Sequence, residues 1–260
     1  MLSCAQNNLK LFRTTSRSVG LQLIKGTRGY SAAMGQTESR GAKGESLERQ
    51  KAVYEYWFKA LEETGFGQDG LKKAGRLWFG VEDGKPLSAE EKHAIDEDIR
   101  NKFGEDLQKF KEGKYDEWPE TAKGVTASCI LGDQMSRNIY RGKSEAFAQD
   151  GKVRGIVKKA LDNGMDIDLP FTVRTFWYMP LMHSEDIEDH KKVIEFYETQ
   201  EGCLPDGWQK AYAQNGLSFA KSHAEVIEKF GRYPHRNAVL GRQSTPEEEE
   251  YLKTADRWGQ

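Results

Sequence analysis

The sequence predicts an all-α protein, and three observations support that class. Apolar residues recur at helical spacing, hydroxyl and carboxyl residues stand where helices begin, and no segment alternates apolar with polar residues over six positions. Short turns that contain glycine or proline separate the helical segments, and such turns favour antiparallel helix pairs. We therefore expect a single all-helical domain over residues 47–260.

The first helix of this domain is expected from Ser46 to about Glu63. Its apolar residues at the i, i+3, i+4 and i+7 positions are Tyr54, Trp57, Phe58 and Leu61. The following segment, Gly65–Gly70, matches the pattern G-x-G-x-x-G. A dinucleotide-binding loop needs a strand before this pattern, and here a helix precedes it, so we expect a flexible turn.

Two capping boxes mark the starts of further helices. Ser88-Ala89-Glu90-Glu91 begins a long helix that Gly113 ends, and Thr245-Pro246-Glu247-Glu248 begins the last helix of the chain. The helices expected between them run from Pro119 through Cys129, from Ser144 to Gly164, from Phe171 to Met179 where Pro180 interrupts, from a Ser184 cap to Gly202, and from Asp206 to Lys229.

The N-terminal thirty residues have a composition of their own. They contain five basic residues, several hydroxyl residues and no acid, and the first acid of the chain is Glu38. Such a basic, amphipathic start resembles a mitochondrial or plastid transit peptide, and Arg28-Gly29-Tyr30-Ser31 resembles a matrix processing site. We expect residues 1–30 to be removed and residues 31–46 to form a flexible leader. The expected location is the mitochondrial matrix, with the plastid stroma as the alternative.

Charge and hydropathy exclude several classes of partner. Removal of residues 1–30 takes the formal charge from −2 to −7, and a net acidic body argues against a nucleic-acid surface. The longest runs without a charged residue, among them Ala211–Ala220, are half the length that a membrane-spanning helix needs. The chain has no H-E-x-x-H motif, no G-x-S-x-G motif and no C-x-x-C pair, so we predict no metal site and no cofactor.

Four clusters of polar residues stand at expected helix ends, in segments 131–142, 179–186, 230–237 and 240–248. The candidate ligand-binding residues are Asp133, Gln134, Arg137, Asn138, Arg232, Arg236, Asn237 and Arg242. Closely spaced guanidinium groups repel one another unless acids or an anion compensate them, and arginine holds carboxylates and phosphates well. The candidate acid–base residues are His183, Glu185 and His235.

Three functions remain open on these residues, and the third is a metal-dependent enzyme, whose ligands would be His183, Glu185, His190 and His235 although they lack a known metal-site spacing. In the first, the clusters form a pocket for a small polar or anionic molecule. The protein could then also be an enzyme that uses His183 and Glu185 for acid–base chemistry. In the second, the clusters tie helix ends together and the protein is a scaffold for a protein or peptide partner. Asp133 and Arg137 stand four residues apart and can pair on one helix, which suits either reading.

The clusters also carry a family resemblance. They resemble the domain-of-unknown-function 924 family, whose pattern includes F-W-F, D-Q-x-x-R-N-x-x-R-G, P-x-x-H-S-E-D and F-G-R-x-P-H-R-N-x-x-L-G-R in that order. The first block departs slightly here, as Tyr56-Trp57-Phe58, and Ala146-Phe147-Ala148-Gln149-Asp150 also fits. The resemblance covers about Val53 to Leu252. It implies a tetratricopeptide-like helical array and implies no particular activity.

Overall fold

Helices account for most of the part of the chain that the structure describes. The structure is a computed structural model, which describes residues 32–255 and, from residue 43, their side chains. The predicted all-α class is confirmed, while the tetratricopeptide-like arrangement stays a prediction. None of the helices in residues 32–255 combines the length and apolar character needed to cross a bilayer.

The first described helix is α2 (Ala32–Glu62), and it starts earlier than the sequence predicts. Ser46 therefore lies inside a helix, so the prediction of a helix start there was wrong. The stretch expected to be a leader belongs to α2 from Ala32 onward, and its alanine, methionine, glutamine and glutamate residues suit a helix. The expected transit peptide lies outside the described residues and stays a prediction.

Residues up to Glu48 and residues from Arg49 onward belong to separate compact units, and the remaining description concerns the second. The segment expected to be a flexible turn instead leads into helix α3 (Gln68–Phe79), which the sequence analysis missed. A two-stranded antiparallel hairpin of β1 (Val81–Glu82) and β2 (Lys85–Pro86) follows. The Ser88 capping box is confirmed at the start of α4 (Ala89–Lys111).

The next helical run changes its helix type along its length. A 3-10 turn, η2, leads into α5, and a π-helical segment, η3, connects α5 to α6. Their bounds are η2 (Trp118–Glu120), α5 (Ala122–Cys129), η3 (Ile130–Met135) and α6 (Ser136–Ile139). The helix expected from Pro119 is thus a 3-10 turn followed by a new helix that Thr121 caps.

Two further predictions are corrected in the middle of the chain. The Ser144 start gives only a 3-10 turn, η4 (Ser144–Phe147), and the helix itself is α7 (Asp150–Asp162). Pro180 does not interrupt α8 (Phe171–Met182), which continues past it. A proline removes one hydrogen-bond donor, and near the end of a helix that loss is tolerable.

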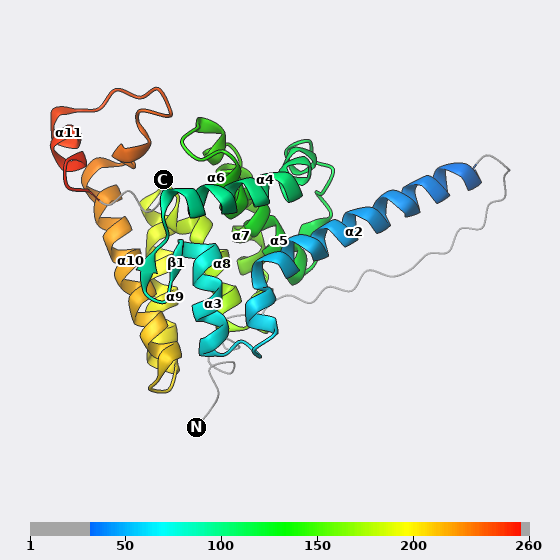
Figure 1. Ribbon diagram of the computed structural model, residues 1–260, viewed down its shortest axis with the longest axis horizontal. Helices are drawn as coiled ribbons and strands as arrows, with labels where there is room; N and C mark the ends of the chain where they lie inside the picture. The colour runs from blue at the N-terminus through cyan, green and yellow to red at the C-terminus, as the bar shows by residue number, and fades with distance from the viewer. Residues whose placement is uncertain (1–31, 256–260) are drawn as a thin grey trace, which may run out of the picture. The chain divides into compact units, whose positions relative to one another are not determined.

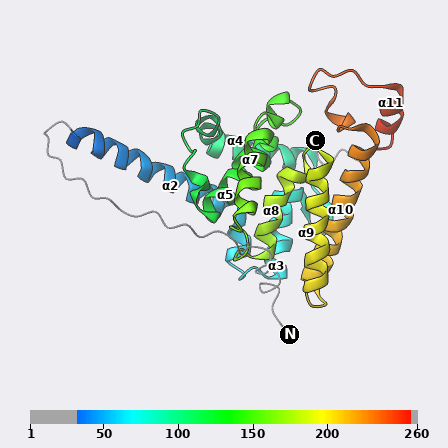
Figure 2. The same cartoon turned by 180° about the vertical axis from the view of Figure 1, so that it is seen from behind.

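The C-terminal helices form an antiparallel hairpin and a short cap. Helices α9 (Ile187–Cys203) and α10 (Trp208–Phe230) lie side by side in both views, joined by a short turn (Figures 1 and 2). Gly231 ends α10 in the left-handed conformation, as expected. The chain then forms the 3-10 turn η5 (Pro234–Arg236) and, after the confirmed Thr245 capping box, α11 (Pro246–Leu252).

An aromatic-rich core holds these helices together. The largest fully buried side chains include Trp57, Trp118, Trp177 and Phe176. The Trp177 indole nitrogen donates to the Thr126 hydroxyl at 2.8 Å, so the polar edge of the ring is paired inside the core. This core fixes α5, α7 and α8 against one another, and the functional cluster lies at the ends of these helices.

Candidate functional site

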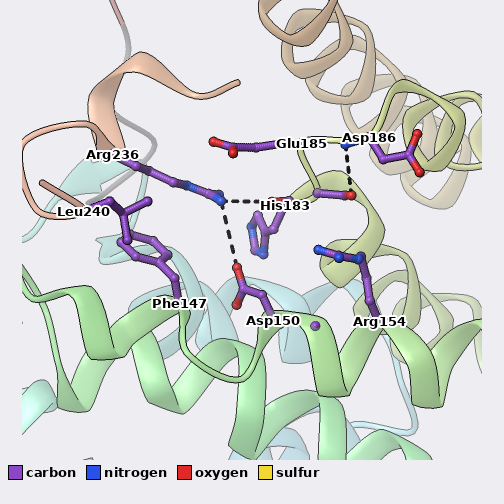
Figure 3. Close-up of a pocket in the computed structure, with 10 residues that line it drawn as sticks. Phe147, Asp150, Arg154, His183, Glu185, Asp186, Arg236 and Leu240 are labelled. Atoms are coloured by element: carbon purple, nitrogen blue, oxygen red, sulfur yellow. Dashed lines mark hydrogen bonds and ion pairs between the residues drawn. The ribbon is translucent and has the colours of Figure 1, made fainter. Parts of the chain in front are cut away.

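Two of the polar clusters of the sequence, 179–186 and 230–237, contribute to one pocket of about 440 Å³. The start of α7, the turn between α8 and α9, and the η5 segment surround it (Figure 3). Its lining residues are Phe147, Asp150, Gly151, Arg154, His183, Ser184, Glu185, Asp186, Arg236 and Leu240. Three segments that lie far apart in the sequence therefore contribute to one cavity.

The centre of the site is an aspartate–histidine pair. Asp133 is fully buried on η3, and its carboxylate oxygens lie 2.9 and 3.1 Å from Nδ1 of His183. The amide of Gln134 donates to the same carboxylate at 2.5 Å, and the Arg137 guanidinium lies 3.0 Å from it. π-Helical segments are rare and are frequent at functional sites, and here one carries the aspartate that meets the histidine.

The charges of this pair determine which histidine nitrogen holds the proton. Burial alone would raise the pKa of Asp133, but Arg137 and His183 outweigh burial and hold that pKa below its usual range. Burial lowers the pKa of His183, and nearby guanidinium groups lower it further although Asp133 raises it. At neutral pH the aspartate is thus ionised and the histidine neutral. An ionised carboxylate only accepts hydrogen bonds, so Nδ1 carries the hydrogen and Nε2 is left as an acceptor.

Asp150 is the second buried carboxylate of the site. Arg137 holds it with two hydrogen bonds of 3.0 and 2.9 Å, in the paired geometry that guanidinium and carboxylate groups favour. Arg137 thereby links Asp150 to Asp133 beneath the pocket. Because Arg137 is one cation between two carboxylates, Asp133 and Asp150 together retain one negative charge that a further cation can balance.

Arg236 is that further cation, and it is only 5% exposed. One of its terminal nitrogens donates to the backbone carbonyl of His183 at 3.0 Å and lies 3.8 Å from Asp150 (Figure 3). Its guanidinium lies between the rings of Phe147 and Tyr233, 4.8 and 4.4 Å from their centroids. Its buried Nε has no hydrogen-bond partner.

The hydrogen-bonding capacity of the Arg236 guanidinium is therefore incompletely used, although Asp150 lies near enough to balance its charge. Burial lowers the pKa of Arg236 to about 10, and the neighbouring Arg137 acts in the same direction. Among the described residues, the other carboxylates near the pocket have partners of their own: Asp186 accepts from the Glu188 backbone nitrogen, and Asp189 lies 3.7 Å from Arg154. Arg242 holds Glu185 at 2.8 and 3.0 Å, and Lys158 lies 2.6 Å from Asp189.

One helix N-terminus and a second arginine add positive potential to the same space. Helix α7 begins at Asp150, and its N-cap residue Gln149 places no side-chain hydrogen bond on the first turn. Helix α9 begins nearby, but the Asp186 carboxylate already caps it by accepting from the Glu188 backbone nitrogen at 3.0 Å. Arg154, one turn into α7, directs its guanidinium toward the His183 ring (Figure 3). Free N–H groups and the helix dipole at such ends favour an anion.

Other predicted site residues lie away from this pocket and stabilise the local structure. The Arg232 guanidinium binds Glu248 at 2.6 and 2.7 Å, and the Asn237 amide donates to Glu248 at 3.2 Å. Asn138 donates to Asp96 at 2.8 Å. These groups connect the 230–245 segment to α11, and α6 to α4.

The two remaining acid–base candidates are placed differently from His183. Glu185 lines the pocket, but it accepts hydrogen bonds from Arg242 and from the backbone nitrogen of Tyr233. His235 does not line the pocket, and its ring packs 5.3 Å from that of Tyr233. Of the three candidates, His183 therefore combines an orienting partner with access to the cavity.

The sequence analysis did not select Phe147, Asp150 or Arg154 as site residues. A signal for two of them was present, because Phe147 and Asp150 belong to one of the blocks that carry the family resemblance. Arg154 stands four residues after Asp150, and that spacing places both on one face of α7. Among residues 32–255, no group of three or more histidine, cysteine or acidic residues is arranged to hold a metal ion.

Comparison with known proteins supports the resemblance drawn from the sequence. The model of a family described as bacterial proteins of unknown function, domain of unknown function 924, matches residues 53–256. The chain belongs to this family.

One solved structure extends the comparison. The chain is similar to ATU0120, a protein of unknown function from Agrobacterium tumefaciens, with 29% identity and a TM-score of 0.57. The match covers 75% of this chain and 97% of that protein. No similar protein was found among curated proteins. The comparisons thus establish the family and a related structure.

Proposed function

We propose that the protein binds a small anionic molecule in the pocket between α7, the α8–α9 turn and η5, with Arg236 as its principal contact. The observation that carries the proposal is the state of Arg236. It is buried, its Nε is unpaired, and the nearest carboxylate, on Asp150, already binds Arg137. A buried guanidinium with an unpaired donor is costly, and an anion in the pocket that accepts from Arg236 would relieve that cost.

The rest of the lining supports the same ligand class. Arg154 and the first turn of α7 add positive potential, and Gly151 leaves space at the start of α7 because it has no side chain. A volume of about 440 Å³ lies within the range of small-molecule sites. The position of His183 Nε2 makes general-base chemistry on a bound molecule the form of enzyme activity that this site suits.

Binding of phosphate tests the proposal. We expect phosphate to bind the protein and to raise its melting temperature at constant ionic strength, because a ligand of the folded state stabilises it. The Arg236→Gln variant should bind phosphate at least about tenfold more weakly, since one charge-assisted contact contributes about 1.5–3 kcal/mol. Isothermal titration calorimetry measures the affinity, and circular dichroism checks that the helix content is unchanged.

Two further variants make that experiment specific. Arg154→Gln should also weaken phosphate binding, and its partly exposed side chain makes loss of folding a small risk. Arg76→Gln is the matched control, because Arg76 is an exposed arginine on α3 that pairs with Glu82 and does not line the pocket. Equal phosphate affinity in Arg236→Gln, Arg154→Gln and the unchanged protein would contradict the proposed site.

The alternative of a scaffold for a protein partner has less support. The scaffold alternative requires all the polar clusters to be structural. Arg232 and Asn237 do stabilise the local structure, but His183 and Arg236 line a cavity. The mitochondrial location, with the plastid as alternative, stays a prediction. The N-terminal residue of the protein isolated from its cells would check it, with Ser31 expected first.

A further inference from the structure

We propose that the pocket selects an anion that carries its own hydroxyl donor, such as hydrogen phosphate or a 2-hydroxycarboxylate, and that His183 Nε2 accepts the hydrogen bond from that hydroxyl. This inference rests on the proposed anion-binding function and adds a selection rule to it. The pocket then combines donors for the charged group with one acceptor for the hydroxyl.

The acceptor follows from the surroundings of His183. Its Nδ1 faces the buried Asp133 carboxylate at 2.9 and 3.1 Å, so the ring hydrogen resides on that nitrogen. Within residues 32–255, Nε2 makes no hydrogen bond, and the side chain is 18% exposed where it lines the pocket. The ring therefore offers a lone pair, and not an N–H group, to a bound molecule.

The donors lie on the other sides of the same cavity. Arg236 approaches from the η5 segment and Arg154 from α7, with the His183 ring between the two guanidinium groups (Figure 3). Buried arginines attract every small anion of suitable size, so they cannot by themselves select one with a hydroxyl. The lone pair of His183 can, because it repels an anionic oxygen that carries no hydrogen and accepts from one that does.

Asp133 is a positioning residue in this proposal. It contacts no ligand, but as a carboxylate it keeps the hydrogen on Nδ1 of His183. An amide at residue 133 can donate to Nδ1 instead, and the ring hydrogen would then move to Nε2. The pocket would change from offering an acceptor to offering a donor, and its preference between anions would change with it.

Two matched pairs of anions test the selection rule. At about pH 8, hydrogen phosphate and sulfate have similar shape and the same charge, and only hydrogen phosphate has a hydroxyl. Glycolate and acetate differ in the same way among carboxylates. We expect the protein to prefer the hydroxyl-bearing member of at least one pair by about tenfold or more, because the other member leaves the histidine acceptor unpaired. Calorimetry at constant ionic strength measures each affinity, and the pair that discriminates identifies the ligand class.

Variants connect the preference to the histidine. His183→Ala should bring the affinity ratio within the discriminating pair close to one, while the hydroxyl-free anion still binds through Arg236. Asp133→Asn should lower the ratio or reverse it, an outcome that a purely structural role of Asp133 does not produce. His235→Asn is the control, since His235 does not line the pocket, and it should keep the ratio of the unchanged protein.

The outcomes separate the two proposals. Equal affinities within both pairs would overturn the selection rule and leave anion binding intact. A ratio that His183→Ala does not change would overturn the role of His183, even where the pair discriminates. Failure of all four anions to bind would overturn both the selection rule and the proposed function.

Discussion

Glu248 is a residue whose contacts distinguish a structural role from a binding role. It is 2% exposed, and it accepts hydrogen bonds from Arg232, from Asn237 and from the backbone nitrogen of Thr245. The sequence analysis predicted Arg232 and Asn237 as ligand-binding residues and Thr245 as a helix cap. Their engagement with one buried carboxylate explains how arginines can gather in a short segment without a ligand.

We predict that Glu248→Gln lowers the free energy of unfolding by about 2 kcal/mol, because the Arg232 guanidinium loses its charged acceptor. Urea denaturation measures this change. Glu247→Gln, at an exposed neighbouring position, should stay within about 0.5 kcal/mol of the unchanged protein. Phosphate affinity should not change in either variant. If Glu248→Gln weakened phosphate binding as much as Arg236→Gln, Arg232 would belong to the binding site.

At the scale of elements, the close approach of η2 to α5 depends on a glycine. A Cβ atom built on Gly124 of α5 would lie 1.7 Å from the backbone carbonyl oxygen of Trp118 in η2. A backbone atom cannot move aside as a flexible side chain can. The residue that allows this contact also helps to position the run from α5 through η3 to α6, which carries Asp133 and Arg137.

Gly124→Ala should therefore lower the free energy of unfolding by about 3 kcal/mol, because the two elements must separate. Gly155→Ala is the matched control on α7, where a Cβ would meet nothing within 4 Å. That variant should raise the free energy of unfolding by about 0.5–1 kcal/mol, since alanine suits a helix interior better than glycine. Urea denaturation compares the two, and similar values would contradict the close approach.

The start of α9 shows how an element boundary differs from its sequence signal. Both Ser184 and Asp186 are residues that cap helices, and the sequence analysis selected the serine. In the structure Asp186 caps α9 by accepting from the Glu188 backbone nitrogen at 3.0 Å, while the Ser184 hydroxyl accepts from the backbone nitrogen of Asp186. The shift of the cap by two residues leaves Glu185 outside the helix, where it lines the pocket beside His183.

At the scale of the whole molecule, buried histidines make stability depend on pH. The rings of His190, His223 and His235 lie 6.2, 5.9 and 5.3 Å from that of Tyr233, although they come from separate segments. Burial lowers the pKa of His223 from 6.5 to about 3, although the hydrogen bond that the ring donates to the Phe219 carbonyl acts to raise that pKa. Burial and Arg236 lower the pKa of His235 from 6.5 to about 4.

A group with a lowered folded-state pKa binds a proton more readily when the chain is unfolded. Stability is therefore fully present above pH 6.5 and decreases as the pH falls toward 4, before most carboxylates titrate. Between pH 7 and pH 5 we expect a loss of up to about 2 kcal/mol for His223 and less for the half-buried His235. Urea denaturation at both pH values measures it.

The His223→Asn variant isolates one contribution to that pH dependence. Asparagine retains a donor for the Phe219 carbonyl, which the ring of His223 contacts at 2.8 Å, but it does not titrate in this range. The decrease in stability from pH 7 to pH 5 should be smaller in this variant than in the unchanged protein. An equal decrease would show that the His223 ring is not held neutral by the fold.

The sequence by itself determined the features that depend on neighbouring residues. The capping boxes at Ser88 and Thr245 and the glycine stop at Gly231 were predicted correctly, because a cap is formed by residues a few positions apart. The Asp133–Arg137 pair could be predicted for the same reason, since the two residues stand four positions apart. The all-α class and the family followed from the periodicity and from blocks that stand in a fixed order.

Only the tertiary structure decided which of the polar residues share a site. Asp133 meets a histidine fifty positions away, and Arg236 approaches an aspartate already held by Arg137. Such pairings depend on how η3, α7 and η5 pack together, which no local pattern contains. Burial then determines the charge of His183 and leaves one donor of Arg236 without a partner. A binding pocket and a structural ion pair can use the same residue types, and long-range packing and desolvation distinguish them.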